Sequence, residues 1–254
     1  MAEAALALSL ISFLSFSLSR NRARLFRLGR MAIAAASIAL LALVIYRSIR
    51  ISFPALTGTY EGLVVLAWAL SAFLVLAERR VLKSNHLVMA AGAFAVFLYL
   101  AILSSPLVSS ELNPPVPILR SFWLVVHVAF SFIGIALFTA GTAAAVAGFF
   151  QQDSAKADAA RDASVALGFV FYATGGLLFG AIWAEAAWGR FWGWDPKETW
   201  ALITTLVYTA YLHLRYIGKI KPSLARVLVI LAWLTALFTF WGVNALLPGL
   251  HSYA

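Results

Sequence analysis

The segment 183–200 holds the densest group of residues that could do chemistry. It reads WAEAAWGRFWGWDPKETW and contains five of the nine tryptophans in the chain. One or two tryptophans at a membrane interface are commonplace, but Gly189 and Gly193 predict breaks in the helix on either side of Arg190. We therefore expect the indoles of Trp188, Trp192 and their neighbours to line a shaped surface that suits a large, flat, apolar ligand.

The stretch 195–198, Asp-Pro-Lys-Glu, predicts the start of a helix. Asp suits the N-cap, Pro the first helical position and Glu the third, as in a capping box. We expect capping to be the main role of Asp195 and Glu198. A capped helix start also offers N–H groups and a positive dipole end to an anion, and Arg190 and Lys197 add cations that match haem propionates.

Histidine is the other residue type here that could bind iron. Two neutral imidazoles near the tryptophans could supply both axial ligands of a haem, and His127 and His251 are the candidates. A single histidine in a membrane helix more often pairs with a polar neighbour. His213 follows the tryptophans at a distance of about 20 Å along a helix, and His86 is interpreted as a solvated boundary residue.

The composition indicates the elements that must position these residues. Hydrophobic residues make up 63% of the 254 residues and charged residues 11%, which is too apolar for a soluble domain. With no cysteine, the chain has no disulfide, thiolate metal site or covalent haem linkage of its own. We expect an all-α, polytopic membrane bundle in a single domain, residues 1–254. About eight transmembrane helices are predicted, at 4–19, 31–49, 59–77, 86–103, 120–150, 165–188, 200–217 and 224–247.

The basic residues predict the orientation of these helices, because positively charged loops stay in the cytoplasm. Alternate loops hold fourteen and five of the nineteen Lys and Arg residues. The five are Arg47, Arg50, Arg120, Arg190 and Lys197. Both termini, the tryptophans, His127 and His251 are therefore expected outside, and His213 near the inner face. This role in topology explains the net charge of +9 without a nucleic-acid partner.

Several stretches of the chain resemble the CcsA (ResC) family of the system II cytochrome c synthase, within the haem-handling superfamily named for its WWD motif. They cover most of the chain from about residue 54 onward, whereas the first 50 residues match only as apolar helices. The stretches are WGRFWGWDPKETWALIT, YLHLR, HVAFSFIG around His127, TYEGL at 59–63 and FWGVNALLPGLHSYA at the C-terminus.

The resemblance implies an external haem platform, residues 183–200, with His127 and His251 as axial ligands of haem b. The platform residues would be Trp188, Trp192, Trp194, Asp195, Glu198 and Trp200. His213 would bind haem on its way across the membrane, with its second ligand from the partner protein CcsB (ResB). A self-contained inner site that pairs His213 with His86 is the less favoured arrangement.

The function implied is transport of haem and its presentation, at the outer face of a bacterial cytoplasmic membrane, to the CxxCH segment of an apocytochrome c. No side chain of this chain is expected to be catalytic, and synthase activity is expected only together with CcsB. Two alternatives stay open. One is a haem exporter or carrier of the CcmC type that hands haem to a chaperone, and the other is a membrane scaffold without a cofactor.

Overall fold

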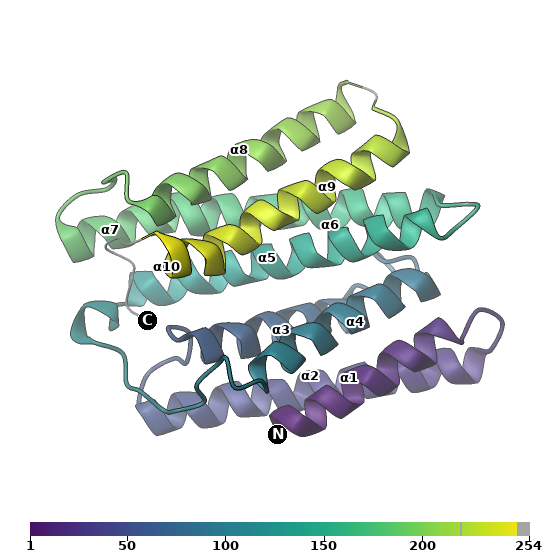
Figure 1. Cartoon of the computed structure of the whole chain (residues 1–254), viewed down its shortest axis with the longest axis horizontal. Helices are drawn as coiled ribbons and strands as arrows, with labels where there is room; N and C mark the ends of the chain where they lie inside the picture. The colour runs from purple at the N-terminus through teal and green to yellow at the C-terminus, as the bar shows by residue number, and fades with distance from the viewer. Residues whose placement is uncertain (219, 248–254) are drawn as a thin grey trace.

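The computed structural model describes residues 1–218 and 220–247, and these form helices and turns without a strand. α6, η2 and α7 follow one another without a break, as do α9, η3 and α10, so the described residues form eight antiparallel rods (Figure 1). Each rod overlaps one predicted span, which confirms the all-α fold. The elements are α1 (Ala2–Ser17), α2 (Ala23–Ile51), α3 (Thr59–Leu76), α4 (His86–Leu103), η1 (Pro117–Leu119), α5 (Phe122–Phe149), α6 (Ala155–Ala173), η2 (Thr174–Phe179), α7 (Gly180–Trp188), α8 (Pro196–Tyr216), α9 (Pro222–Leu237), η3 (Phe238–Gly242) and α10 (Val243–Leu246).

Six of the rods are long and apolar enough to cross a membrane. They are α2, α3, α4, α5, the α6–α7 rod and the α9–α10 rod. α1 has only 16 residues, and α8 is 21 residues long but is not apolar enough. The fold is therefore that of a multi-pass membrane bundle, with two further helices packed alongside the six.

α5 is the central helix, in contact with α3, α4, α6 and α9. Small residues on its faces let these neighbours approach closely. A Cβ at Gly134 would lie 2.7 Å from the backbone nitrogen of Tyr172, and one at Gly141 would lie 2.7 Å from Val165. The close approach of α6 fixes where η2 and α7 continue past the N-terminal half of α5.

The two ends of the bundle differ in character. One end carries the turns after α1, α3, α5 and α8, and we call it the basic end because most Lys and Arg residues lie in or beside these turns. The opposite end carries segments 52–58, 104–121 and 189–195 (Figure 1). We call the latter the tryptophan end, because the loop between α7 and α8 lies there. The sequence predicted this same grouping of loops.

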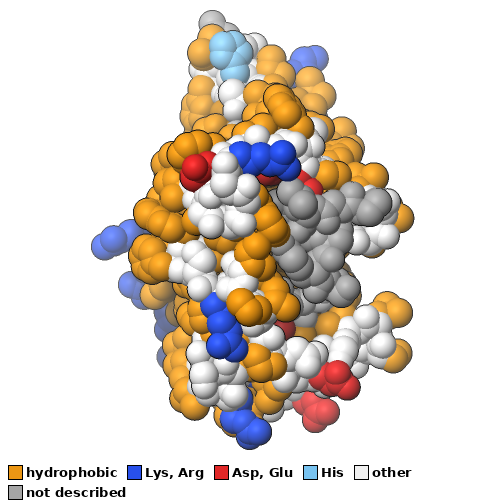
Figure 2. Space-filling model, turned by 90° about the vertical axis from the view of Figure 1, so that its left-hand side faces the viewer, with side chains coloured by type: hydrophobic (Ala, Val, Ile, Leu, Met, Phe, Trp, Pro, Cys, Tyr) orange, Lys and Arg blue, Asp and Glu red, His pale blue; other side chains and the backbone are white. Residues whose placement is uncertain are grey.

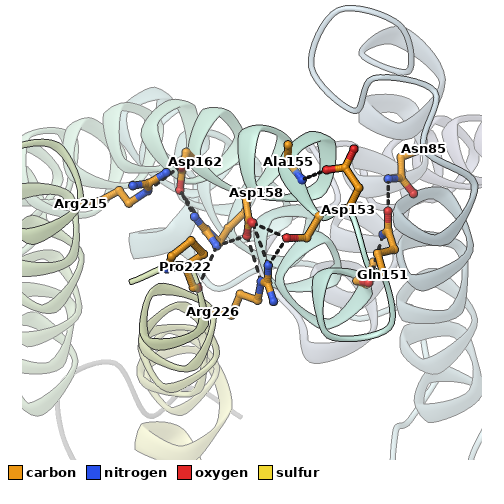
Figure 3. Close-up of polar contacts among 12 residues, drawn as sticks. Asn85, Gln151, Asp153, Ala155, Asp158, Asp162, Arg215, Pro222 and Arg226 are labelled. Carbon is orange, nitrogen blue, oxygen red and sulfur yellow. Dashed lines mark hydrogen bonds and ion pairs between the residues drawn. The ribbon is translucent and has the colours of Figure 1, made fainter. Parts of the chain in front are cut away.

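Buried ion pairs join α6, α8 and α9 near the basic end (Figure 3). The carboxylate of Asp158 accepts hydrogen bonds from Arg161 and from Arg226, the latter at 2.8 Å. Asp162 accepts one from Arg215 of α8 at 2.8 Å. Arg161 is fully buried, and a buried charge needs such partners. The pairs therefore anchor the C-terminal half of α8, the helix that begins at the tryptophan end.

Candidate functional site

The loop between α7 and α8 is non-helical, and both glycines that the sequence predicted as helix breakers, Gly189 and Gly193, lie in it. α7 ends at Trp188, and Gly189 follows in the left-handed region with φ 71°. α8 begins only at Pro196. Trp194 also has a positive φ of 57°, which is uncommon for a residue with a side chain. The backbone of this loop therefore has a defined, non-helical conformation, which determines where its aromatic side chains lie.

The start of α8 is capped as predicted. Asp195 is the N-cap, and its carboxylate accepts a hydrogen bond from the Lys197 N–H at 3.0 Å. Glu198 reaches back to accept from the backbone N–H of Gly193 at 2.8 Å and of Asp195 at 3.2 Å. The two carboxylates thus satisfy backbone donors of the helix start and fix the end of the loop.

A cavity of about 220 Å³ lies at the tryptophan end, between α5, η2, α7, the start of α8 and η3. Its wall is mostly aromatic and aliphatic, with a few polar side chains, as is usual for sites of organic ligands. It is lined by Leu56, Thr57, Gly58, Thr59, Leu119, Leu124, His127, Val128, Ser131, Phe132, Ile135, Tyr172, Gly176, Gly180, Ala181, Trp183, Phe191, Trp192, Lys197, Glu198, Ala201, Thr239, Phe240, Trp241 and Asn244. We refer to it as the His127 cavity.

His127 of α5 lies in the wall of this cavity with a fixed ring orientation. Its Nδ1 lies 2.7 Å from the carbonyl oxygen of Gly175, and its ring is parallel to that of Trp183 at 6.1 Å between centroids. A carbonyl only accepts, so Nδ1 carries the proton and donates. This tautomer places the lone pair on Nε2, which is the atom that would bind a metal, and it is the arrangement found at many metal-ligating histidines.

Two wide helical turns shape the cavity. η2 and η3 have π-helical hydrogen bonding, which inserts an extra residue into the turn and often marks a functional site. η2 brings the Gly175 carbonyl to His127, and a Cβ at Gly180 would lie only 3.1 Å from the His127 ring. η3 contributes Phe240 and Trp241 to the cavity wall, where the Phe240 ring stands edge-on to Phe132 of α5 at 5.2 Å. Both turns therefore deliver groups that a regular helix would place elsewhere.

The tryptophans of segment 183–200 fall into separate places. Trp183 and Trp192 line the cavity. Trp194 is 69% exposed and stands edge-on to Trp192 at 5.8 Å. Trp188 packs edge-on to Trp183 at 6.0 Å, and Trp200 packs on Phe238 at 4.3 Å. Only Trp192 of the four predicted platform tryptophans is thus in the cavity wall, and the others support or flank it.

The two predicted propionate cations also differ in position. Lys197 is half-buried in the cavity wall, and its Nζ donates to the side-chain oxygen of Asn244 at 2.9 Å. Arg190 is exposed on the loop, and its side chain lies over Gly193, where a Cβ would come within 2.8 Å of it. Figure 2 shows hydrophobic and uncharged side chains over much of this end, with several Lys, Arg, Asp and Glu side chains among them. Lys197 therefore lies in a mostly apolar cavity wall, where a cation favours an anionic group of an amphipathic ligand.

Among the other histidines that the structure describes, His213 and His86 are not in the cavity wall. His251 lies outside the described residues. His213 is exposed near the C-terminal end of α8, and His86 begins α4 at the basic end. α8 packs on α6 and α9, whereas α4 packs on α1, α3 and α5. The structure thus gives no support to an inner site that pairs His213 with His86.

Sequence reasoning missed the contribution of η3 and of the segment before α3. Phe240, Trp241 and Asn244 line the cavity, and so does segment 56–59. The stretch FWGVN at 240–244 could have indicated them, because two aromatic residues, a glycine and an amide occur together near the end of an apolar helix. Their position beside His127 depends on tertiary packing.

Comparisons with known proteins identify the family of this chain. Residues 56–251 match the family described as Cytochrome C assembly protein. The chain belongs to this family. The match begins at the segment that lines the cavity ahead of α3 and covers α5, the tryptophan loop and α8.

Named relatives support the same assignment. The chain is 34% identical over 224 residues to the cytochrome c biogenesis protein CcsA of Chlamydomonas reinhardtii, covering 79% of this chain and 61% of that protein. It is 35% identical over 244 residues to CcsA of Prochlorococcus marinus strain MIT 9313, covering 79% and 76%. It is 35% identical over 216 residues to the protein NrfI of Wolinella succinogenes, of which it spans 23%, against 78% of its own length.

A solved structure shares the fold. The chain superposes on the structure named Cytochrome c Heme Lyase CcmF with a TM-score of 0.75 over 94% of this chain and 45% of that one. The two sequences are 19% identical, so the likeness concerns the arrangement of the helices. Family and fold together make this a cytochrome c assembly protein with a multi-pass helical bundle.

Proposed function

We propose that the chain binds haem in the His127 cavity and presents it for covalent attachment to an apocytochrome c. The observation that carries the proposal is the His127 ring, oriented by the Gly175 carbonyl in a cavity with aromatic walls. Haem is flat and apolar with two carboxylates at one edge. Trp183, Trp192 and Phe240 offer flat apolar surfaces, and Lys197 offers a cation.

Haem is the substrate in this proposal, and the chain supplies position and iron ligation. His127 is the ligand within the described residues, and His251 is proposed as the second ligand on the strength of the family resemblance. The CxxCH segment of the apocytochrome brings two thiols and a histidine. Each thiol S–H adds across a haem vinyl C=C, with sulfur bonding one carbon and hydrogen the other, so no nucleophile from this chain is needed.

The proposed topology has eight spans, with both termini and segment 183–200 outside a bacterial cytoplasmic membrane. The basic end then faces the cytoplasm, as the distribution of Lys and Arg favours. His213, exposed on α8, is proposed as a haem ligand during transfer across the membrane. Its exposure suits a second ligand from a CcsB-type partner.

Co-expression tests the proposed function. The chain is produced in a bacterial host with CcsB, a CxxCH apocytochrome and no other maturation system. We expect covalently bound haem on the cytochrome, measured by haem staining after denaturing electrophoresis, and its loss in His127→Ala. Haem that stays on the chain without a covalent product would instead support a carrier of the CcmC type, and would contradict the synthase assignment.

A further inference from the structure

Positive charge is concentrated where α2 and α3 reach the basic end. Segments 18–34 and 75–86 contain one acidic residue, Glu78, against eight basic ones. The basic residues are Arg20, Arg22, Arg24, Arg27, Arg30, Arg79, Arg80 and Lys83. Such an excess attracts anions, and strongly so at a membrane surface.

The single acid leaves most of this charge uncompensated. Glu78 is buried, accepts a hydrogen bond from Ser84 at 3.0 Å and lies 3.6 Å from Arg30. Arg79 and Arg80 are exposed, and neither has an ion pair within the part of the chain that the structure describes. Their guanidinium groups therefore face the surroundings of the protein, next to Arg30.

These arginines border a groove between α2 and α3 whose other half is apolar. Its wall at this end holds three arginines, Arg30, Arg79 and Arg80, and one acid, Glu78, so its net charge there is positive. Met31, Ala34, Val75 and Leu76 continue the wall toward the middle of the bundle. Leu76 is 82% exposed and Met31 is 67% exposed. The small side chain of Ala34 leaves width between the helices. The groove thus has a cationic mouth and an apolar continuation along the helix axes.

We propose that this groove binds one anionic phospholipid. The phosphate lies among Arg30, Arg79 and Arg80, whose planar donors match phosphate oxygens in pairs. An acyl chain runs along Met31 and Leu76 in the membrane direction. A soluble anion would use the arginines alone and leave the apolar half of the groove uncovered, so the combined chemistry selects a lipid. This site lies at the opposite end from the His127 cavity and does not rest on the proposed function.

Native mass spectrometry of the purified full chain tests the proposal. Detergent-solubilised protein is titrated with dioleoyl phosphatidylglycerol, with dioleoyl phosphatidylcholine and with inorganic phosphate. We expect one phosphatidylglycerol to be retained about tenfold more strongly than phosphatidylcholine. The same preference should fall about tenfold in R79Q/R80Q, because both side chains are exposed and their loss does not disturb the core.

The matched control is R20Q/R22Q, which removes two exposed cations from the α1–α2 turn of the same end. It should keep the wild-type preference. Equal losses in both variants would reduce the effect to net charge and overturn the site. Leu76→Ser should also weaken retention, and an unchanged value would contradict the acyl-chain position. Displacement of the lipid by millimolar phosphate, or by equimolar haem, would assign the groove to that ligand and overturn the proposal.

Discussion

Gly180 sets how closely α7 can approach the His127 ring. A Cβ there would lie 3.1 Å from the ring atoms Cε1 and Nδ1, which is closer than ordinary van der Waals contact. Gly180→Ala should therefore displace the imidazole from the Gly175 carbonyl and lower the affinity for haem severalfold, measured by titration of the Soret band. The matched control is Gly176→Ala in the same cavity wall, where the nearest side-chain atom is 3.8 Å away. Equal losses of haem affinity in Gly180→Ala and Gly176→Ala would argue against a role for the His127 ring position in haem binding.

Trp192 and Trp194 should differ in how much each contributes to haem retention. Trp192 lines the cavity, whereas Trp194 is 69% exposed and touches Trp192 edge-on. Trp192→Ala should remove a cavity wall and cost haem retention about tenfold or more. Trp194→Ala should cost less, since an aromatic pair contributes about 1 kcal/mol beyond its buried area. The measurement is the haem-to-protein ratio after purification, and a larger loss in Trp194→Ala would contradict the assignment of the cavity.

Roles that depend on contacts close in sequence could be predicted, and roles that depend on distant contacts could not. Asp195 and Glu198 were placed correctly, because a cap involves only neighbours within a few residues. His127 was singled out by type and depth, but its bond to Gly175 was not foreseen, since that contact spans 48 residues of sequence and depends on the packing of α6 on α5. Trp241 was missed for the same reason.

At the scale of elements, the capping box should control the order of the tryptophan loop. Glu198→Ala removes the acceptor of the Gly193 and Asp195 N–H groups, while Glu198→Gln keeps an oxygen in the same place. We expect faster hydrogen exchange of these two amides in Glu198→Ala and a much smaller change in Glu198→Gln. A lost cap costs about 1 kcal/mol, so the rest of the bundle should keep its exchange pattern.

The boundaries of most helices, such as 86–103, could be predicted from the length of the apolar segments, whereas the π-helical turns η2 and η3 could not. A π-helical turn shifts the repeat of apolar residues by one position. Glycines such as Gly175 and Gly176 do not reveal this shift in the sequence. Both turns border the cavity. The part of the fold hardest to predict is thus the part that shapes the site.

For the whole molecule, the two ends must lie on opposite sides of a membrane. The chain has no cysteine, so single cysteines report their own accessibility without background. Gln152→Cys, in the α5–α6 turn, should resist a membrane-impermeant maleimide in intact cells, and Ser109→Cys, in the loop after α4, should react. Both positions are exposed. The reverse labelling would invert the topology and place the His127 cavity at the cytoplasmic face.

Haem binding by this chain is proposed to depend on His127, as a ligand of the iron in the cavity at the tryptophan end. The most direct measurement is the visible spectrum of the purified chain with haem supplied, compared among wild type, His127→Ala and His86→Ala. The second variant removes a histidine at the opposite end of the bundle and serves as the control. We expect a Soret band in wild type and His86→Ala, and a weakened, shifted band in His127→Ala. Identical spectra in all three proteins would contradict this proposal.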